Sequence, residues 1–282
     1  MAWELGTTWQ PTSLKQVGES HDTSTGTTEV LTDIGRAYIK PMGNRQGPHV
    51  LATDWVGTHL ARWFGLSTFD IAILELGESD RFPLPRGHRA DAGPALASRA
   101  VQGFPWGNSA DELGNLINPD DVTRLIVFDT WTLNCDRHFP DPVVRGPNYD
   151  NVFISTEGVQ VGRSRLLAID HGLCFIRSNE DLTEHVSHID KIRDSRLYGL
   201  FPSFSEFLRT EILDQCVRRL REVTPGLVTD VIATVPGAWE VAPQARNALG
   251  ELIFRRAVFV ADNIVSWFYR DCPSFGGPGA KK

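Results

Sequence analysis

The spacing of hydrophobic and polar residues in the first hundred positions predicts several short strands and one helix. Leu51, Trp55, Leu60 and Phe64 recur at about one-turn spacing, which is typical of an amphipathic helix over residues 49–64. The remaining apolar runs are short and are separated by Gly-, Asp- and Thr-containing turns, which favours strands. We expect these strands at residues 14–18, 29–31, 36–41, 69–76 and 95–101.

The pattern becomes mainly helical after a connector at residues 102–118 that contains Gly, Pro and Asn. Asn118 and Pro119, followed by two acids, are typical of a helix start. Ser203 and Glu206 fit a capping box at the start of a later helix. We expect helices at residues 119–133, 203–222, 226–233 and 243–268, and strands at residues 151–155, 159–161 and 165–169.

This order of elements predicts an α+β protein built from two lobes that share a cleft. The N-lobe comprises residues 1–103 and is rich in antiparallel strands, whereas the C-lobe comprises residues 104–272 and is mainly helical. Residues 273–282 are rich in Gly, so we expect a disordered tail there.

Composition and charge exclude several classes of protein. The chain is 41% hydrophobic and 22% charged, which is ordinary for a globular protein. A net charge of −7 gives no general attraction to nucleic acid or anionic lipid, so we expect no direct nucleic-acid partner. No stretch reaches the roughly 18 apolar residues of a membrane span, and the start lacks a secretory signal. Together with four scattered cysteines, this predicts a cytoplasmic protein without membrane insertion.

Three polar residues downstream of the connector suggest phosphoryl-transfer chemistry. Asp136 follows a predicted helix, Asn151 opens a short strand, and Asp170 follows another strand. Phosphoryl transfer requires a group that orients the attacking hydroxyl and oxygen ligands for the metal ions beside the phosphates. Asn and Asp supply the oxygen ligands that suit Mg²⁺. Each residue alone could be a turn former or a cap, but their order with strands between them favours a site.

These motifs resemble those of HipA-like kinases and, more remotely, of phosphatidylinositol kinases. Asp136-Arg-His, Asp150-Asn-Val-Phe-Ile and Ile169-Asp-His-Gly are similar to the catalytic and metal-binding loops of these families. Tyr38-Ile-Lys-Pro-Met-Gly-Asn-Arg and the helix that contains Asp54-Trp resemble the lysine strand and first helix of the small HipA-like group. The resemblance runs from about residue 38 to residue 175 and implies a two-lobed protein-kinase-like fold that uses ATP and Mg²⁺.

The resemblance also implies roles for individual residues. Asp136 would orient or deprotonate the acceptor hydroxyl, and Asn151 and Asp170 would bind Mg²⁺. Lys40 would contact the α- and β-phosphates of ATP, with Asp54 as its acidic partner on the first helix. A flexible ammonium group needs such a partner because it must be held in place to act on a phosphate.

Two further segments are candidates for contacts with ATP. Ser24, Thr25, Gly26 and Thr27 form the one small, hydroxyl-rich turn placed to cover the phosphates. Because this turn lacks a Gly-x-Gly-x-x-Gly pattern, an ordinary polar hairpin is an alternative interpretation. The adenine ring is expected against the backbone of residues 100–103, where the connector begins, including Ala100 and Gln102.

The sequence departs from the usual kinase pattern at two places. In most kinases the metal-binding Asn follows the catalytic Asp by about five residues, but here Asn151 follows Asp136 by fifteen. We interpret residues 139–147 as an insertion, and Asp141 or Asp150 remain alternatives to Asn151 as metal ligand. In addition, a His stands where most kinases have the Phe of Asp-Phe-Gly.

The sequence defines the phosphoryl acceptor less well than it defines the phosphoryl-transfer reaction. The resemblance to HipA-like kinases favours a protein Ser/Thr kinase with a protein substrate. A small molecule or a lipid headgroup is an alternative acceptor on the same fold, although the acidic charge balance disfavours a lipid. A pseudokinase that binds a nucleotide or a partner without catalysis is a further alternative, suggested by the insertion and the irregular phosphate loop.

Overall fold

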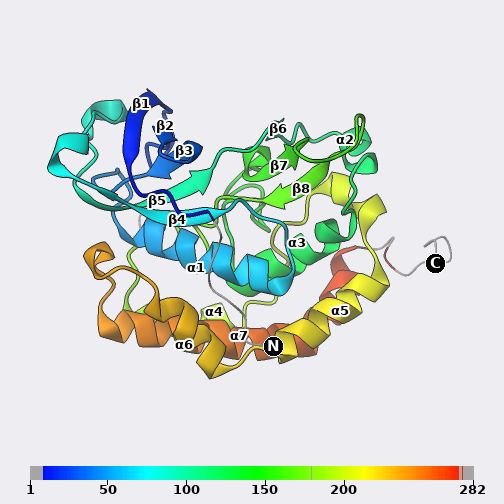
Figure 1. The fold of residues 1–282 in the computed structure, drawn as a ribbon. Coiled ribbons are helices and arrows are strands. Elements are labelled where there is room, and N and C mark those ends of the chain that lie inside the picture. The colour runs from blue at the N-terminus through cyan, green and yellow to red at the C-terminus, as the bar shows by residue number, and fades with distance from the viewer. Residues whose placement is uncertain (1–8, 179, 273–274, 276–282) are drawn as a thin grey trace.

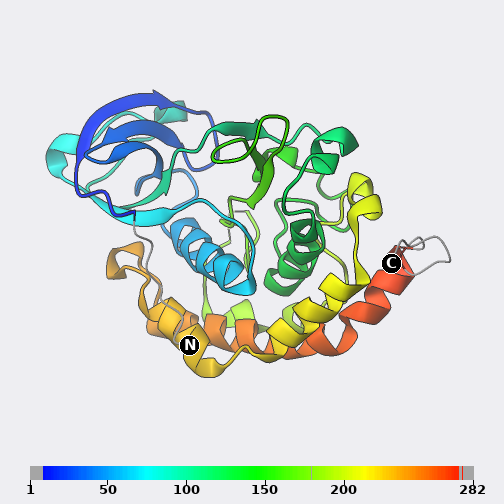
Figure 2. The same cartoon turned by 45° about the vertical axis from the view of Figure 1, so that its right-hand side comes forward.

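The computed structural model describes residues 9–178, 180–272 and 275. A strand-rich part lies at one end of the molecule, and long helices run along the opposite side (Figure 1). The view in Figure 2 shows helix α1 (His49–Phe64) between the larger sheet and the C-terminal helices. Most of the predicted tail at residues 273–282 lies outside the described residues. This arrangement confirms the predicted α+β fold, with strands first and helices second.

The first part is a five-stranded antiparallel sheet with the strand order β1-β2-β3-β5-β4. The strands are β1 (Leu14–Ser20), β2 (Thr28–Thr32), β3 (Gly35–Lys40), β4 (Ile71–Leu76) and β5 (Gly93–Arg99), and each lies within two residues of its predicted ends. Val30, Ala37 and Ile39 alternate with more exposed residues and pack into a small core on one face. Gly35 has a φ of 127°, which permits the tight turn from β2 into β3.

Helix α1 joins this sheet to the rest of the protein. It ends at Gly65, whose left-handed backbone is typical of a residue that follows a helix. Nearly all of its side chains are buried because the helix contacts β5 on one side and helices of the C-terminal part on the others. A residue on α1 can therefore contact both parts of the molecule.

A three-stranded sheet follows the connector, in the order β6-β7-β8. Its strands are β6 (Gly103–Pro105), β7 (Val152–Ser155) and β8 (Arg165–Ala168), and it is accompanied by helices α2 (Ala110–Gly114) and α3 (Asp120–Thr132). The prediction of a strand at residues 159–161 was wrong, since these residues lie in turns and Val161 is exposed. Strand β6 was not predicted because its side chains are exposed, and it exists through pairing with a strand distant in the sequence.

The chain thus leaves the larger sheet at Arg99 and enters the smaller one at Gly103. The predicted boundary between an N-lobe and a C-lobe falls at this passage. The division into an N-lobe of residues 1–103 and a C-lobe of residues 104–272 stays a prediction.

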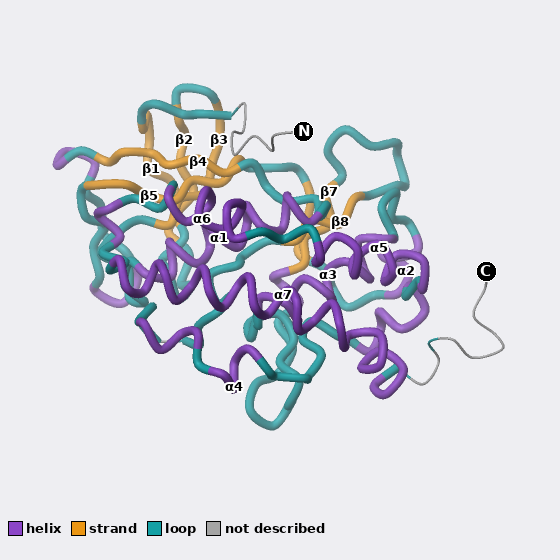
Figure 3. The backbone as a smooth tube through the Cα atoms, turned by 90° about the horizontal axis from the view of Figure 1, so that it is seen from below, coloured by secondary structure: helices purple, strands orange, loops and turns teal. Residues whose placement is uncertain are grey.

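The remaining helices form the side of the molecule seen in Figure 3, along which α7 runs. They are α4 (Ile189–Ile192), α5 (Thr210–Arg221), α6 (Pro225–Ala233) and α7 (Pro243–Asp271). Short 3₁₀ turns occur at Glu78–Asp80, Pro85–Gly87, Tyr149–Asn151, Glu184–Ser187, Pro202–Phe207 and Gly237–Trp239. Among the described residues, none of the helices combines the length and the apolar character that crossing a membrane requires.

The prediction of one helix over residues 203–222 was wrong in its first turns. The extended backbone of Arg209 separates a 3₁₀ turn from α5. Its backbone N–H donates to the Thr123 hydroxyl at 3.0 Å, so a contact with α3 replaces a helical hydrogen bond. Ser203 does not cap a helix as predicted, because its hydroxyl pairs with the side chain of Asn108 at 2.8 Å.

Candidate active site

Lys40, the last residue of β3, joins two carboxylates that belong to different parts of the molecule. Its Nζ atom lies 2.7 Å from Asp54 Oδ2 on α1 and 2.8 Å from Asp170 Oδ1 after β8. The Lys40 and Asp54 side chains are largely buried, whereas 38% of the Asp170 side chain is exposed. The structure therefore brings together three of the residues that the sequence predicted for the site.

The charges of these three groups depend on one another. Burial acts to lower the pKa of Lys40, but the two neighbouring carboxylates outweigh it and raise the pKa above its ordinary value. Burial raises the pKa of Asp54, with a further contribution from the negative charge of Asp170. Burial acts in the same direction on Asp170, but Lys40 prevails and lowers its pKa. Lys40 and Asp170 are consequently both charged at neutral pH.

The backbone around Asp170 holds an unusual conformation that places its carboxylate beside Lys40. Asp170 has a φ of 54°, in the left-handed region that non-glycine residues seldom adopt. The next backbone N–H, that of His171, donates to Asp54 Oδ1 at 2.9 Å. The carbonyl of Gly172 accepts from the Thr53 hydroxyl at 2.5 Å. Helix α1 thus holds the Asp-His-Gly segment through side chains on two consecutive positions.

His171 occupies the interior where most kinases place a Phe. Its ring is buried, packs against the Phe128 ring at 5.4 Å and contacts the Thr58 hydroxyl through Nδ1 at 3.0 Å. Burial lowers the pKa of His171 well below its ordinary value, so the ring is neutral at physiological pH. A neutral imidazole of this kind serves as a packing group with one polar contact.

Asp136 and Asn151 form a second pair among the predicted site residues. Helix α3 ends at Leu133, which has a left-handed backbone, and the Asn134 side chain accepts from the Asp136 N–H at 3.1 Å. The Nδ2 group of Asn151 donates to Asp136 Oδ2 at 2.9 Å. The guanidinium group of Arg145 contacts the other carboxylate oxygen, Oδ1. Both oxygens of the predicted catalytic Asp are therefore occupied by neighbouring side chains.

Arg137 connects the segments that carry these residues. Its Nε donates to Asp129 Oδ2 at 2.8 Å, and both side chains are completely buried. Its Nη1 donates to the carbonyl of Ile169 at 3.0 Å and also to the carbonyl of Asn151. One guanidinium group thus ties the catalytic segment to the backbone of Asn151, one predicted metal ligand, and to the residue before Asp170, the other.

The donor atoms fit a Mg²⁺ ion bound together with phosphates. In the described part of the chain, Asn151 Oδ1 and Asp170 Oδ2 accept no hydrogen bond, which leaves an oxygen of each side chain available. Mg²⁺ is commonly held by one or two protein oxygens, with water and substrate phosphates completing its shell. No cluster of three or more His, Cys, Asp or Glu residues suited to a metal occurs among the described residues.

The two alternative ligands lie in less suitable places. Asp141 is exposed and its carboxylate accepts from the N–H of Val143 at 3.0 Å within the inserted loop. Asp150 is exposed, whereas its neighbour Asn151 is buried against Asp136. Their surroundings favour Asn151 over Asp141 and Asp150 as the Mg²⁺ ligand. The identity of this ligand stays a prediction.

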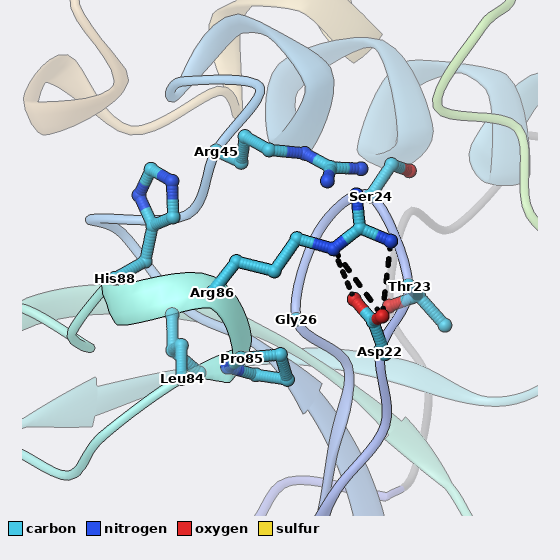
Figure 4. A pocket seen from close by; sticks show the side chains of 9 residues that line it. All are labelled: Asp22, Thr23, Ser24, Gly26, Arg45, Leu84, Pro85, Arg86 and His88. Atoms are coloured by element: carbon cyan, nitrogen blue, oxygen red, sulfur yellow. Dashed lines mark hydrogen bonds and ion pairs between the residues drawn. The ribbon is translucent and has the colours of Figure 1, made fainter.

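The candidate phosphate loop forms the tip of the β1–β2 hairpin (Figure 4). Thr25 is buried and its hydroxyl contacts that of Thr27 at 3.2 Å, so these two side chains shape the turn itself. Gly26 has a φ of 61°, and Leu84 packs beneath it. Ser24 lines a small pocket at the tip together with residues from two other loops. The predicted contacts of this turn with phosphate stay a prediction.

Arg86 holds this tip from the loop between β4 and β5. Its guanidinium group makes a two-pronged ion pair with Asp22, at 2.8 and 2.9 Å (Figure 4). Figure 4 also shows Arg45 reaching toward Ser24 from the loop that follows β3. Two guanidinium groups therefore face one carboxylate, which leaves the pocket with excess positive charge beside the phosphate-loop candidate.

The connector offers few free backbone groups for an adenine ring. The N–H of Gln102 donates to Glu157, and its carbonyl accepts from Thr156 at 3.0 Å. The N–H of Ala100 donates to Arg36 at 3.0 Å. In the described chain the backbone N–H and carbonyl of Val101, between Ala100 and Gln102, make no hydrogen bond, so they are the groups available to an adenine ring. Adenine binding at this segment remains a prediction.

Sequence reasoning did not identify Arg145 or Arg86 as parts of the site. Both are arginines in irregular segments, where neither spacing nor a motif marks them. The excess of residues between Asp136 and Asn151 was a signal for an inserted loop, but it gave no indication that the loop folds back onto Asp136.

Comparisons with known proteins agree with this geometry. A profile of the HipA-like kinase family matches residues 30–257. No curated protein sequence matches the chain. Among solved structures, the proinflammatory kinase CtkA of Helicobacter pylori is similar with a TM-score of 0.56 and 11% identity, over 94% of this chain and 99% of that chain. At this identity the likeness concerns the fold, and it confirms a kinase-like one. Because the family profile spans most of its length, this chain belongs to the HipA-like kinase family.

Proposed function

We propose that the protein is an ATP- and Mg²⁺-dependent kinase that phosphorylates Ser or Thr residues of a protein substrate. The observation that carries this proposal is the position of Lys40 between Asp54 and Asp170. This arrangement holds a cation and a candidate metal ligand together before any nucleotide binds, which lowers the entropic cost of binding the phosphates. Asp136 and Asn151 stand beside them through the shared brace of Arg137.

Each group has a distinct task in this proposal. Asn151 and Asp170 would hold Mg²⁺, and Lys40 would orient the phosphates. When bound, Mg-ATP supplies the phosphoryl group and a cation that offsets its charge. The acceptor oxygen forms a bond to the γ-phosphorus while the bond from that phosphorus to the bridging oxygen of ADP breaks. Asp136 orients the hydroxyl and receives its proton, and it becomes a stronger base when the charged Arg145 releases its carboxylate oxygen.

One observation favours a second candidate, a nucleotide-binding pseudokinase. Both oxygens of Asp136 accept a hydrogen bond from a neighbouring side chain, and the positive charge of Arg145 makes the carboxylate a weaker base. Against this candidate, Lys40, Asp136, Asn151 and Asp170 are all present, and Lys40 is already paired with both acids.

Thermal unfolding with Mg-ATP tests the nucleotide site. A ligand at about a hundred times its dissociation constant adds roughly 2.7 kcal/mol to the free energy of unfolding. We expect a Mg²⁺-dependent rise in the melting temperature for the wild type and none for Asp170→Asn. Asp190→Asn is a matched control because Asp190 is exposed on α4. If Mg-ATP stabilises neither protein, the kinase proposal fails.

The acceptor is tested separately with ATP labelled at the γ-phosphate. Incubation with a cell extract is expected to label a protein on Ser or Thr, and Asp136→Asn is expected to abolish the label. A labelled metabolite without any labelled protein contradicts the protein-kinase proposal and supports a small-molecule acceptor. Binding of Mg-ATP without transfer to any acceptor supports the pseudokinase.

A further inference from the structure

The inserted loop, residues 139–147, is fixed at both ends and exposed in the middle. At its start, the Phe139 ring packs against Tyr198 at 5.7 Å and lies beneath the Arg196 guanidinium at 5.4 Å. Just after its end, the Asn148 N–H donates to the carbonyl of Arg137 at 2.8 Å. At its tip, 94% of the Val143 side chain is exposed. The loop therefore presents its tip beside the catalytic segment from a firm base.

Arg145 is the residue through which this tip contacts the candidate catalytic centre. Its Nη2 atom contacts Asp136 Oδ1, while 37% of its side chain remains exposed to solvent. Only 12% of the Asp136 side chain is exposed, so the pair is reached from the solvent through Arg145. The half-exposed guanidinium group of Arg145 can therefore contact a second anion that approaches from the solvent.

A second arginine faces the same place from the segment that follows Asp170. Arg177 is exposed, and in the described chain no carboxylate pairs with its guanidinium group. Burial raises the pKa of the Cys135 thiol to about 11, and the positive charges of Arg145 and Arg177 both act to lower it. The Cys135 thiol also lies 3.5 Å from the carbonyl of Ile176, the residue before Arg177, so the segment that carries Arg177 lies against the catalytic segment. Two arginines thus lie in the segments beside Asp136, on a chain whose net charge is −7.

We propose that Arg145, assisted by Arg177, forms a subsite for carboxylate side chains that flank the acceptor hydroxyl. This inference rests on the proposed kinase function. In the free protein Asp136 occupies the subsite through its contact with Arg145. An acidic acceptor segment takes its place, and the exchange releases Asp136 Oδ1 to receive the hydroxyl proton. Acceptors with Glu or Asp beside the phosphorylated residue are consequently preferred.

A binding experiment tests the subsite without relying on phosphoryl transfer. The probe is a fluorescein-labelled peptide with a single Ser between Glu residues, compared with a peptide that has Gln in place of Glu. Asp136→Asn removes the competing carboxylate, so we expect it to bind the Glu peptide about tenfold more tightly than the wild type does. Adding Arg145→Gln to Asp136→Asn is expected to abolish this gain. Equal affinity of the single and double variants for the Glu peptide overturns the proposal.

Steady-state kinetics distinguish binding of the acceptor by Arg145 from an action of Arg145 on the transferred phosphoryl group. Arg145→Gln is expected to raise KM for the Glu peptide about tenfold and to change KM for the Gln peptide far less. Arg218→Gln is a matched control, because Arg218 is an exposed arginine on α5. An equal loss of kcat with both peptides shows that Arg145 acts on the phosphoryl group, which overturns the acceptor assignment. If Mg-ATP does not bind, the kinase proposal fails, and the peptide-binding result still decides this inference.

Discussion

Asp54 Oδ1 accepts a hydrogen bond of 2.9 Å from the backbone N–H of His171, 117 residues further along the chain. Its other oxygen, Oδ2, is 2.7 Å from Lys40 Nζ. One carboxylate thus holds both the candidate phosphate-binding lysine and the backbone beside the candidate metal ligand. Asp54 was expected as the partner of Lys40, and in the structure it is a positioning residue for a second segment as well.

Replacement of Lys40 tests the cation between the two carboxylates. Lys40→Met leaves Asp54 and Asp170 facing each other without a neutralising charge, and Asp54 is buried. We expect a lower melting temperature and a loss of phosphoryl transfer of at least about a hundredfold, which is typical when one electrostatic contact to the reacting group is removed. Lys15→Met on the exposed face of β1 is the control. Transfer at the wild-type rate in Lys40→Met contradicts the assigned role.

The buried pair of Arg137 and Asp129 is expected to stabilise the folded protein. Arg137→Met leaves a buried carboxylate unpaired, and changes of this kind cost about 3–5 kcal/mol. Urea unfolding of Arg137→Met, Asp129→Asn and the double variant measures the coupling between the two side chains. We expect the double variant to be more stable than the sum of the single changes predicts, by at least about 1 kcal/mol. If the losses of unfolding free energy in the two single variants add up to the loss in the double variant, the two side chains are not coupled and the prediction is wrong.

Gly57 on α1 gives the Asp-His-Gly segment room to approach the helix. A Cβ atom at this position lies 2.6 Å from His171 Cβ, which is too close for either side to remain in place. We expect Gly57→Ala to displace the segment, to lower the melting temperature and to weaken Mg-ATP binding. Gly250→Ala on α7 is the matched control, since its Cβ meets only ordinary contacts and Ala favours a helix by about 1 kcal/mol. Similar effects of the two changes refute this explanation.

Stability is expected to fall below pH 6.5 in part because of His59. Burial lowers the pKa of His59 to about 4 from its ordinary value of 6.5, and the positive charge of Arg62 adds to this. The unfolded chain therefore takes up a proton at a higher pH than the folded protein does. The stability contributed by neutral His59 is present above pH 6.5 and is lost as the pH falls toward 4, to a total of about 3 kcal/mol.

Chemical unfolding between pH 7 and pH 4 measures this effect. His59→Phe retains an aromatic ring against Trp55 and removes the titrating group. We expect its stability to fall less steeply with acid than that of the wild type. His185→Phe, at an exposed position, should follow the wild type. Identical pH profiles for His59→Phe and the wild type show that another group is responsible.

Much of the fold was predictable because local patterns and tertiary packing agree there. Helix α1 begins and ends at the predicted residues, since its apolar positions, first-turn context and final glycine all favour the same boundaries. The strands of the five-stranded sheet were likewise marked by short apolar runs and turns. The failure at residues 203–209 lies where a contact with a distant residue, that of Arg209 with Thr123, decides the backbone. Residues 159–161 instead belong to an exposed local turn, in which the Arg163 N–H donates to the carbonyl of Gln160 at 2.9 Å.

The sequence by itself determined the types and order of the candidate site residues, because phosphoryl transfer requires particular donor and acceptor groups that few residues supply. It identified Lys40, Asp54, Asp136, Asn151 and Asp170 before their positions in space were known. The Lys40–Asp54 pair was expected from the resemblance to HipA-like kinases, and tertiary structure decided which of the other residues meet. Lys40 contacts Asp170 across 130 residues, and Arg145 reaches Asp136 from an irregular loop. Such contacts depend on the packing of whole elements and on the path of loops, and neither leaves a periodic signal in the chain.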